Sequence, residues 1–316
     1  MGRYILKRIL MMIPVFIGVS LIVYCICGSN TRPILMRIGG EDITLEQEEA
    51  LKHELGLDQP LMVRYVKYMS GMFRGDLGKS HITGDDVFEA FCKKFPLTMK
   101  LSLLSVLVSV AISLPLGIIT ALKRGSLTDN AGMVAALLGL SIPNFWLGLV
   151  LILVFALRLR WLPSGGYTGF ESLILPAITV GTGMTAACTR QTRSSMLNVL
   201  RSDYLRTARA KGVPERRVIM HHALRNALIP IIANIGGQIA ATLAGASVTE
   251  TVFALSGVGR HIVRAINDYD VNVITGCVTM KAMITATIML GVDLLFALVD
   301  PRIKAQFAAK GGKKNG

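Results

Sequence analysis

Charged and aromatic side chains are scarce in this chain. Of its 316 residues, 17% are charged and 6% are aromatic, whereas 52% are hydrophobic and the mean hydropathy is +0.54. Soluble globular domains carry about 25% charge, and disordered chains carry few apolar residues. The composition therefore excludes a soluble or disordered chain and predicts a protein that resides in a membrane.

Cysteines are also few and are not grouped. The five are Cys25, Cys27, Cys92, Cys188 and Cys277. No pair has the spacing of a zinc or redox motif, and four of them lie within apolar runs. The pattern excludes a disulfide framework, favours buried packing thiols and gives no sign of a metal site.

Acidic residues are outnumbered, with 20 Asp and Glu against 34 Lys and Arg, for a formal net charge of +14. Such an excess is compatible with nucleic-acid binding, because basic patches neutralise phosphates. Membrane topology is the alternative, since basic residues concentrate on the cytoplasmic side of spanning helices. The second interpretation accounts for most of the excess, and no nucleic-acid partner is expected.

Six apolar stretches are long enough to cross a hydrocarbon core of about 30 Å as helices. They are approximately Ile9–Cys27, Leu97–Leu122, Met133–Leu157, Leu173–Thr189, Leu228–Val252 and Val273–Val299. Because nothing in lipid satisfies an open backbone, helices are the expected spanning form. Prolines 14, 115, 143 and 176 are expected to kink or bound these spans.

The basic residues also orient the chain. With the amino terminus in the cytoplasm, nineteen basic residues fall inside and four fall in short outer loops. A secretory signal is the rival explanation for the first stretch, but Cys25, Ile26 and Cys27 stand where small residues would be needed for cleavage. We expect an uncleaved anchor and two cytoplasmic termini.

The long loop between the first two spans is expected to fold as an outer subdomain. Thr44 and Gln47 form a predicted capping box before a helix that ends near Gly56, and Asp85 begins another amphipathic stretch. We therefore divide the chain into an anchor (1–28), an extracytoplasmic subdomain (29–95), a five-helix core (96–300) with a cytoplasmic loop (190–228), and a basic tail (301–316).

A recognisable ATP-binding motif is lacking. The segment from Gly75 to Ser80 reads G-D-L-G-K-S, but Phe73 stands where a phosphate-binding loop requires its first glycine. No strand is expected before it. We expect this chain to bind no cofactor of its own.

The loop from Arg201 to Pro230 is the most informative segment. Gly212 suits the left-handed position after a helix, and Pro214 suits the first turn of the next. These two residues predict a short helical hairpin just before the fifth span. A solvated basic loop that only enforces orientation is the alternative.

This hairpin resembles the cytoplasmic loop of bacterial ABC importer permeases of the dipeptide, oligopeptide and nickel group, D-Y-x-x-T-A-R-A-K-G followed by H-A-L-R-N-A-L-x-P. The loop pattern shared by ABC importer permeases in general fits less well. Arg206 and Thr207 occupy the two positions where that pattern has Glu and its first Ala. Other segments similar to the family are L-G-L-D-Q-P-L, S-I-P-N-F-W-L-G, R-W-L-P-S-G-G-Y, T-E-T-V-F and V-D-P-R-I, in that order along the chain.

The resemblance implies an all-α membrane protein: a six-transmembrane-helix bundle of the type I ABC importer class with an extracytoplasmic helical subdomain, in the bacterial inner membrane. It implies a non-catalytic permease that forms half of a pathway for short peptides, with nickel or another chelated metal as the alternative. The implied partners are a second homologous permease, two ATPase subunits that hold ATP and Mg²⁺, and an extracytoplasmic substrate-binding protein.

The resemblance also implies site residues. Those expected to couple to the ATPase are Asp203, Tyr204, Arg206, Thr207, Ala208, Arg209, Ala210, Lys211 and Gly212. The expected hinge between the loop and the fifth span comprises His222, Arg225, Asn226 and Pro230. Histidines 221 and 222 make a poor metal pair, because adjacent helical side chains point about 100° apart.

Polar residues at membrane depth are the default candidates for a pathway. On the expected fifth span these are Asn234, Gln238, Thr242 and Glu250. The first three share a face at i, i+4 spacing, and packing between helices is their alternative role. Two other classes, an intramembrane enzyme and a channel, are less favoured, because no paired catalytic residues are evident and a channel leaves the hairpin unexplained.

Overall fold

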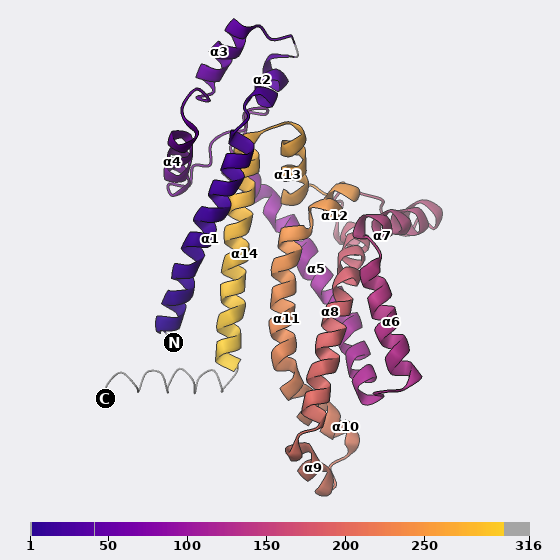
Figure 1. The fold of residues 1–316 in the computed structure, drawn as a ribbon. Coiled ribbons are helices and arrows are strands. Elements are labelled where there is room, and N and C mark those ends of the chain that lie inside the picture. The colour runs from indigo at the N-terminus through magenta and orange to yellow at the C-terminus, as the bar shows by residue number, and fades with distance from the viewer. Residues whose placement is uncertain (1, 41, 300–316) are drawn as a thin grey trace, which may run out of the picture. The chain divides into compact units, whose positions relative to one another are not determined.

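The computed structural model describes residues 2–40 and 42–299, so the predicted basic tail at 301–316 lies outside the described residues. The described chain is helical (Figure 1). Its helices are α1 (Gly2–Gly28), α2 (Arg32–Gly39), α3 (Leu45–Glu54), α4 (Leu61–Met72), α5 (Val87–Leu122), α6 (Leu127–Ser141), α7 (Asn144–Leu151), η1 (Ile152–Arg158), η2 (Phe170–Leu173), α8 (Ile174–Leu200), α9 (Asp203–Ala210), α10 (Glu215–Arg217), η3 (Val218–Ala223), α11 (Leu224–Gly245), α12 (Ser247–Val252), α13 (Val258–Asn267) and α14 (Val271–Val299).

Five helical runs of the described chain are long and apolar enough to cross a membrane: Arg8–Gly28, Val87–Leu122, Phe170–Leu200, Glu215–Gly245 and Val271–Leu294. A bent pair, Leu127–Ser141 with Asn144–Arg158, makes a sixth if it counts as one span. The number of spans expected from the sequence therefore matches the upper count, although several boundaries differ.

The expected third span, Met133–Leu157, is wrong as a single helix. The chain bends by 93° between α6 and α7. Ile142 and Pro143 both adopt extended backbone, with ψ of 121° and 133°. The reason is local, because proline lacks an amide donor and disfavours helical backbone at the residue before it.

The described chain divides into two compact units. The first comprises residues 2–5, 101–242 and 287–299, and the second comprises residues 6–40, 42–100 and 243–286. The division of the sequence into an anchor, an outer subdomain, a core and a tail stays a prediction.

In the first unit, α5 and α8 approach closely through small residues. A Cβ added at Gly117 on α5 would lie 2.5 Å from the Cβ of Thr192 on α8, and one added at Gly181 on α8 would lie 2.7 Å from the Ser105 carbonyl oxygen. Small residues that let helix backbones approach are typical of membrane bundles, where packing replaces the hydrophobic driving force.

The second unit has a core where α1, α5, α13 and α14 meet. Its buried members are Leu77, Val87, Phe91, Val258, Ile262, Ala265, Val273, Ile274 and Cys277. The predicted capping box is confirmed: the Thr44 hydroxyl accepts from the Gln47 amide at 3.3 Å, and the Gln47 side chain accepts from the Thr44 amide at 3.1 Å.

Candidate coupling site

The predicted helix, break and helix are present at residues 203–223. Helix α9 ends at Ala210, and Gly212 has φ +75°, the left-handed conformation that glycine adopts without steric cost. Pro214 directly precedes the next helical segment, α10. Figure 1 shows α9 and α10 at one end of α8 and α11.

The second arm of the hairpin continues into the following span. A single helical run extends from Glu215 to Gly245, and it includes the π-helical turn η3. Pro230 lies inside α11 and does not interrupt it. The four predicted hinge residues, His222, Arg225, Asn226 and Pro230, therefore lie on one continuous helical run, which leaves no flexible linker between hairpin and span.

A cluster of apolar side chains fixes α9 to its neighbours. The buried members of this hairpin cluster are Ala121, Met196, Leu205, Val218, Ala223 and Ala227. They come from α5, α8, α9, η3 and α11. Leu205 is fully buried, and Ala208 packs partly against the cluster. The hairpin is thus a packed part of the bundle and not a solvated loop.

Polar contacts hold the two arms together. The Tyr204 hydroxyl accepts from the Asn226 side-chain amide at 2.8 Å and donates to the His222 carbonyl at 3.3 Å. Arg209 donates twice to the Glu215 carboxylate, at 3.0 and 2.8 Å. This pairing raises the pKa of Arg209, so its charge is engaged within the hairpin.

The remaining predicted coupling residues point outward. Asp203, Arg206, Thr207, Ala210 and Lys211 are exposed. The Arg206 guanidinium lies 3.8 Å from the Asp203 carboxylate, but this pair is within α9 and does not join the two arms. The hairpin therefore presents one exposed polar face that carries two basic residues and one acidic residue.

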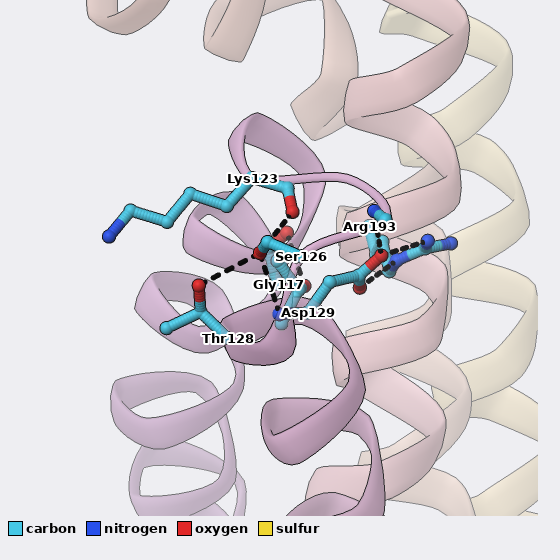
Figure 2. Close-up of polar contacts among 8 residues, drawn as sticks. Gly117, Lys123, Ser126, Thr128, Asp129 and Arg193 are labelled. Carbon is cyan, nitrogen blue, oxygen red and sulfur yellow. Dashed lines mark hydrogen bonds and ion pairs between the residues drawn. The ribbon is translucent and has the colours of Figure 1, made fainter.

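An ion pair braces α8 near the hairpin (Figure 2). The Nε and Nη2 atoms of Arg193 on α8 donate to the two carboxylate oxygens of Asp129 on α6 at 2.8 and 2.7 Å. The Asp129 carboxylate also accepts from the Gly125 amide at 3.0 Å, in the turn between α5 and α6. The Ser126 hydroxyl accepts from the Asp129 amide and so caps the start of α6, which begins at Leu127. Two helices, α6 and α8, and the turn before α6 are thereby joined at one carboxylate.

The polar residues of α11 contact other helices of the first unit. Gln238 is 8% exposed; its amide donates to the Asn234 carbonyl oxygen at 2.7 Å, and its own carbonyl oxygen accepts from Ser109 of α5 at 3.3 Å. The Thr242 hydroxyl lies 3.2 Å from the Met184 sulfur on α8. In this arrangement Gln238 and Thr242 join α11 to α5 and α8, and Asn234 supports Gln238 from within α11. Packing between helices was the alternative to a pathway role.

Glu250 is not part of the fifth span, because α11 ends at Gly245 and Glu250 lies in α12. Its buried carboxylate accepts from the Thr98 hydroxyl at 2.7 Å and from the Arg260 amide at 2.9 Å. A Cβ at Gly257 would lie within 2.5 Å of that carboxylate. The span assignment was wrong, and the side chain holds the start of α13 in place.

Comparison with known proteins identifies the family. The model of the binding-protein-dependent transport system inner membrane component matches residues 113–305, and the model of the N-terminal part of the same membrane components matches residues 1–102. The chain belongs to this family. It is an ABC importer permease.

Curated relatives of the permease match over nearly their whole length. The di/tripeptide transport system permease protein DppB of Pseudomonas aeruginosa is 38% identical, with 97% of this chain and 100% of the relative covered. The dipeptide permease DppB of Escherichia coli K12 is 38% identical (96% and 99% covered), and the oligopeptide permease AppB of Bacillus subtilis is 36% identical (96% and 100% covered).

Among solved structures, the permease resembles a chain of the MetNI methionine ABC transporter. The TM-score is 0.58 at 15% identity, with 67% of this chain and 96% of that chain covered. At this identity the likeness shows the fold alone. That fold is the type I importer permease bundle expected from the sequence, within a multi-pass inner-membrane protein.

Three residues that support the site escaped prediction from the sequence. Leu205 sits inside the motif of the permease loop, but its burial was not inferred. Asp129 follows Ser126 at the spacing of a helix N-cap, which indicates where a helix starts. Arg193 is one of the basic residues that were used only to predict the orientation of the chain in the membrane. Nothing in the sequence pairs these two charges across 64 positions.

Proposed function

We propose that this permease moves short peptides across the membrane as one half of the pathway of an ATP-driven importer. The observation that carries the substrate class is the near-complete match to relatives named as dipeptide, di/tripeptide and oligopeptide permeases. Import of nickel or another chelated metal is the alternative within the same family.

The proposed assembly contains a second homologous permease, two ATPase subunits and an extracytoplasmic substrate-binding protein. ATP and Mg²⁺ would be held by the ATPase subunits, and this chain would be a non-catalytic membrane subunit. Both termini would lie in the cytoplasm, as the distribution of basic residues indicates.

The exposed face of α9 is the proposed ATPase contact. Asp203, Arg206, Thr207, Ala210 and Lys211 offer polar and cationic side chains for docking. Tyr204, Ala208, Arg209 and Gly212 would act indirectly, because they set the position of α9 within the hairpin.

Packing of the hairpin supports a mechanism of force transmission. The hairpin cluster links α9 to α5, α8 and α11, and the Asp129–Arg193 pair adds α6. A displacement of α9 would thus reach four helices at once and not only α11. Moving a two-state equilibrium from 1:99 to 99:1 takes about 5.5 kcal/mol, so a rigid connection is needed to deliver that energy.

The substrate is tested by uptake of a radiolabelled dipeptide into proteoliposomes that contain the full complex and its binding protein. We expect ATP-dependent accumulation that unlabelled dipeptide suppresses and Ni²⁺ does not. Uptake of Ni²⁺ without uptake of dipeptide would replace the peptide assignment by its alternative.

Docking and sidedness are tested with single cysteines on a background in which the native cysteines are replaced. Thr207→Cys should cross-link to an ATPase subunit, and a membrane-impermeant maleimide should not label it in intact cells. Glu46→Cys, exposed on α3, is the matched control: it should be labelled by the maleimide and should not cross-link to the ATPase. A Thr207→Cys variant that never cross-links during ATP turnover would refute docking.

A pathway role for Asn234 and Gln238 requires their exposure in a state other than the one described. Cysteine accessibility at these positions, measured with and without ATP, tests it. Labelling that never changes would leave them as packing residues only.

A further inference from the structure

A cavity of about 250 Å³ lies in the second unit beside α4. Arg64, Lys67 and Tyr68 of α4 line it, together with Tyr24 of α1 and Asn272 of α14. All of these residues belong to the same compact unit. The cavity is separate from the hairpin, which lies in the first unit, and no part of the proposed transport mechanism uses it.

The cavity carries positive charge that the described chain does not neutralise. Neither Arg64 nor Lys67 forms an ion pair with any residue that the structure describes. Arg64 is half-buried, its Nη2 donates to the Gly28 carbonyl at 2.8 Å, and its Nε is buried with no acceptor. Asp76 also lines the cavity and offsets only one of the two cations. An anionic ligand would complete this balance.

The position of the cavity defines where such an anion would come from. Tyr24 lies one turn before α1 ends at Gly28, and Asn272 is the second residue of α14. Both helices are membrane spans, so the cavity lies at the level where two spans leave the hydrocarbon. Lipid headgroups occupy that level, and tyrosines are enriched there.

The aromatic side chains suit a lipid at that depth. The rings of Tyr24 and Tyr68 lie 5.3 Å apart, which gives the cavity an apolar wall beside its cations. Burial raises the pKa of Tyr68 to about 12, so its hydroxyl stays protonated and able to donate. His81 also lines the cavity; burial lowers its pKa, and it adds no positive charge near neutral pH.

The volume of the cavity indicates how large a ligand it can enclose. Pockets that enclose drug-sized molecules measure about 300 to 1,000 Å³. A cavity of about 250 Å³ is smaller and suits a headgroup fragment. We propose that this cavity binds the phosphodiester headgroup of an anionic phospholipid, with the Arg64 and Lys67 side chains contacting the phosphate. Arginine is well matched to phosphate, because its guanidinium offers a planar fork of donors.

The test is native mass spectrometry of the purified permease complex titrated with phosphatidylglycerol or with phosphatidylethanolamine. We expect selective retention of phosphatidylglycerol, weakened about tenfold or more by Arg64→Gln combined with Lys67→Gln. The matched control combines Arg74→Gln with Lys79→Gln, which removes the same charge from exposed residues of the same unit that do not line the cavity. This control should bind phosphatidylglycerol like the wild type.

The double variant could lose lipid because it misfolds, so Lys67→Gln is also measured alone. Lys67 is exposed, so this substitution should not disturb folding. We expect it to weaken retention of phosphatidylglycerol several-fold. Equal retention by the wild type and the double variant would overturn the proposal. Displacement of the lipid by excess inorganic phosphate would also overturn it, because the cavity would then bind a soluble anion. Displacement by glycylglycine would overturn it too, because the cavity would then bind a peptide. Peptide uptake does not enter this measurement, so its outcome is independent of the proposed transport function.

Discussion

Arg193 holds both carboxylate oxygens of Asp129, at 2.8 and 2.7 Å, while Asp129 is only 3% exposed. The pair joins α8 to the start of α6, and α8 runs almost directly into α9. A two-point contact fixes direction as well as distance. The pair therefore holds the end of α8 in one orientation relative to the turn that precedes α6.

We expect Asp129→Asn to lower the free energy of unfolding by about 2 kcal/mol, because the substitution breaks charge-assisted hydrogen bonds and leaves Arg193 without its counter-charge. The apparent Tm of the detergent-purified complex measures the loss. Arg193→Lys keeps the positive charge but not the two parallel donors of the guanidinium, so it should lower Tm by less.

Glu89→Gln is the control for that substitution. It removes another ion pair, between Glu89 and Lys93, whose partners are both exposed on one turn of α5. We expect no measurable change in Tm. An equal fall in the two variants would mean that the position of the Asp129–Arg193 pair is unimportant.

Leu205→Ala should loosen α9. Leu205 is fully buried in the hairpin cluster, and truncation of a buried leucine costs about 3 kcal/mol. Hydrogen exchange should rise over residues 203–210, and uptake should fall at constant ATPase activity of the isolated ATPase subunits. Thr207→Ala, two positions along on the exposed face, should leave exchange unchanged, and a rise there would contradict the packing described.

Replacement of Gly212 separates backbone strain from steric contact. Nothing lies within 4 Å of a Cβ built at this glycine, but its φ of +75° costs an L-residue about 1 kcal/mol. Gly212→Ala should therefore lower Tm modestly, and Gly212→Asn should lower it less, because asparagine tolerates left-handed backbone. Equal effects of the two substitutions would point to a clash and not to strain.

Close packing of α5 against α8 gives a further prediction. A Cβ at Gly117 meets the Thr192 side chain at 2.5 Å, so Gly117→Ala should lower the free energy of unfolding by about 2 kcal/mol. Gly237 in α11 has open space around an added Cβ. Gly237→Ala should be neutral or slightly stabilising in the same thermal assay, and the reverse order would refute the packing.

Local signals predicted much of this fold. The Thr44 capping box, the left-handed Gly212 and the break at Pro143 all depend on residues within a few positions of one another. Long apolar runs likewise predicted the spans, because their length matches the thickness of a bilayer.

Long-range contacts escaped prediction. Spacing at i, i+4 placed Asn234, Gln238 and Thr242 on one face, but it could not tell whether Ser109 and Met184 or a pathway lies opposite. Glu250 follows an apolar run without a proline break, so the turn after Gly245 had no clear signal in the sequence. The size of the 93° angle between α6 and α7 likewise had no signal in the sequence, because Pro143 predicted only that the span bends or ends there.

The uninterrupted run from Glu215 to Gly245 has a mechanical consequence. Its 31 residues, at 1.5 Å each, span about 46 Å, which exceeds the roughly 30 Å of a bilayer core. Such a rod acts as a lever arm, and a tilt of about 10° about one tip sweeps the opposite tip through about 8 Å. In the proposed coupling mechanism, a small rotation at the hairpin would therefore become a larger displacement at the far membrane surface.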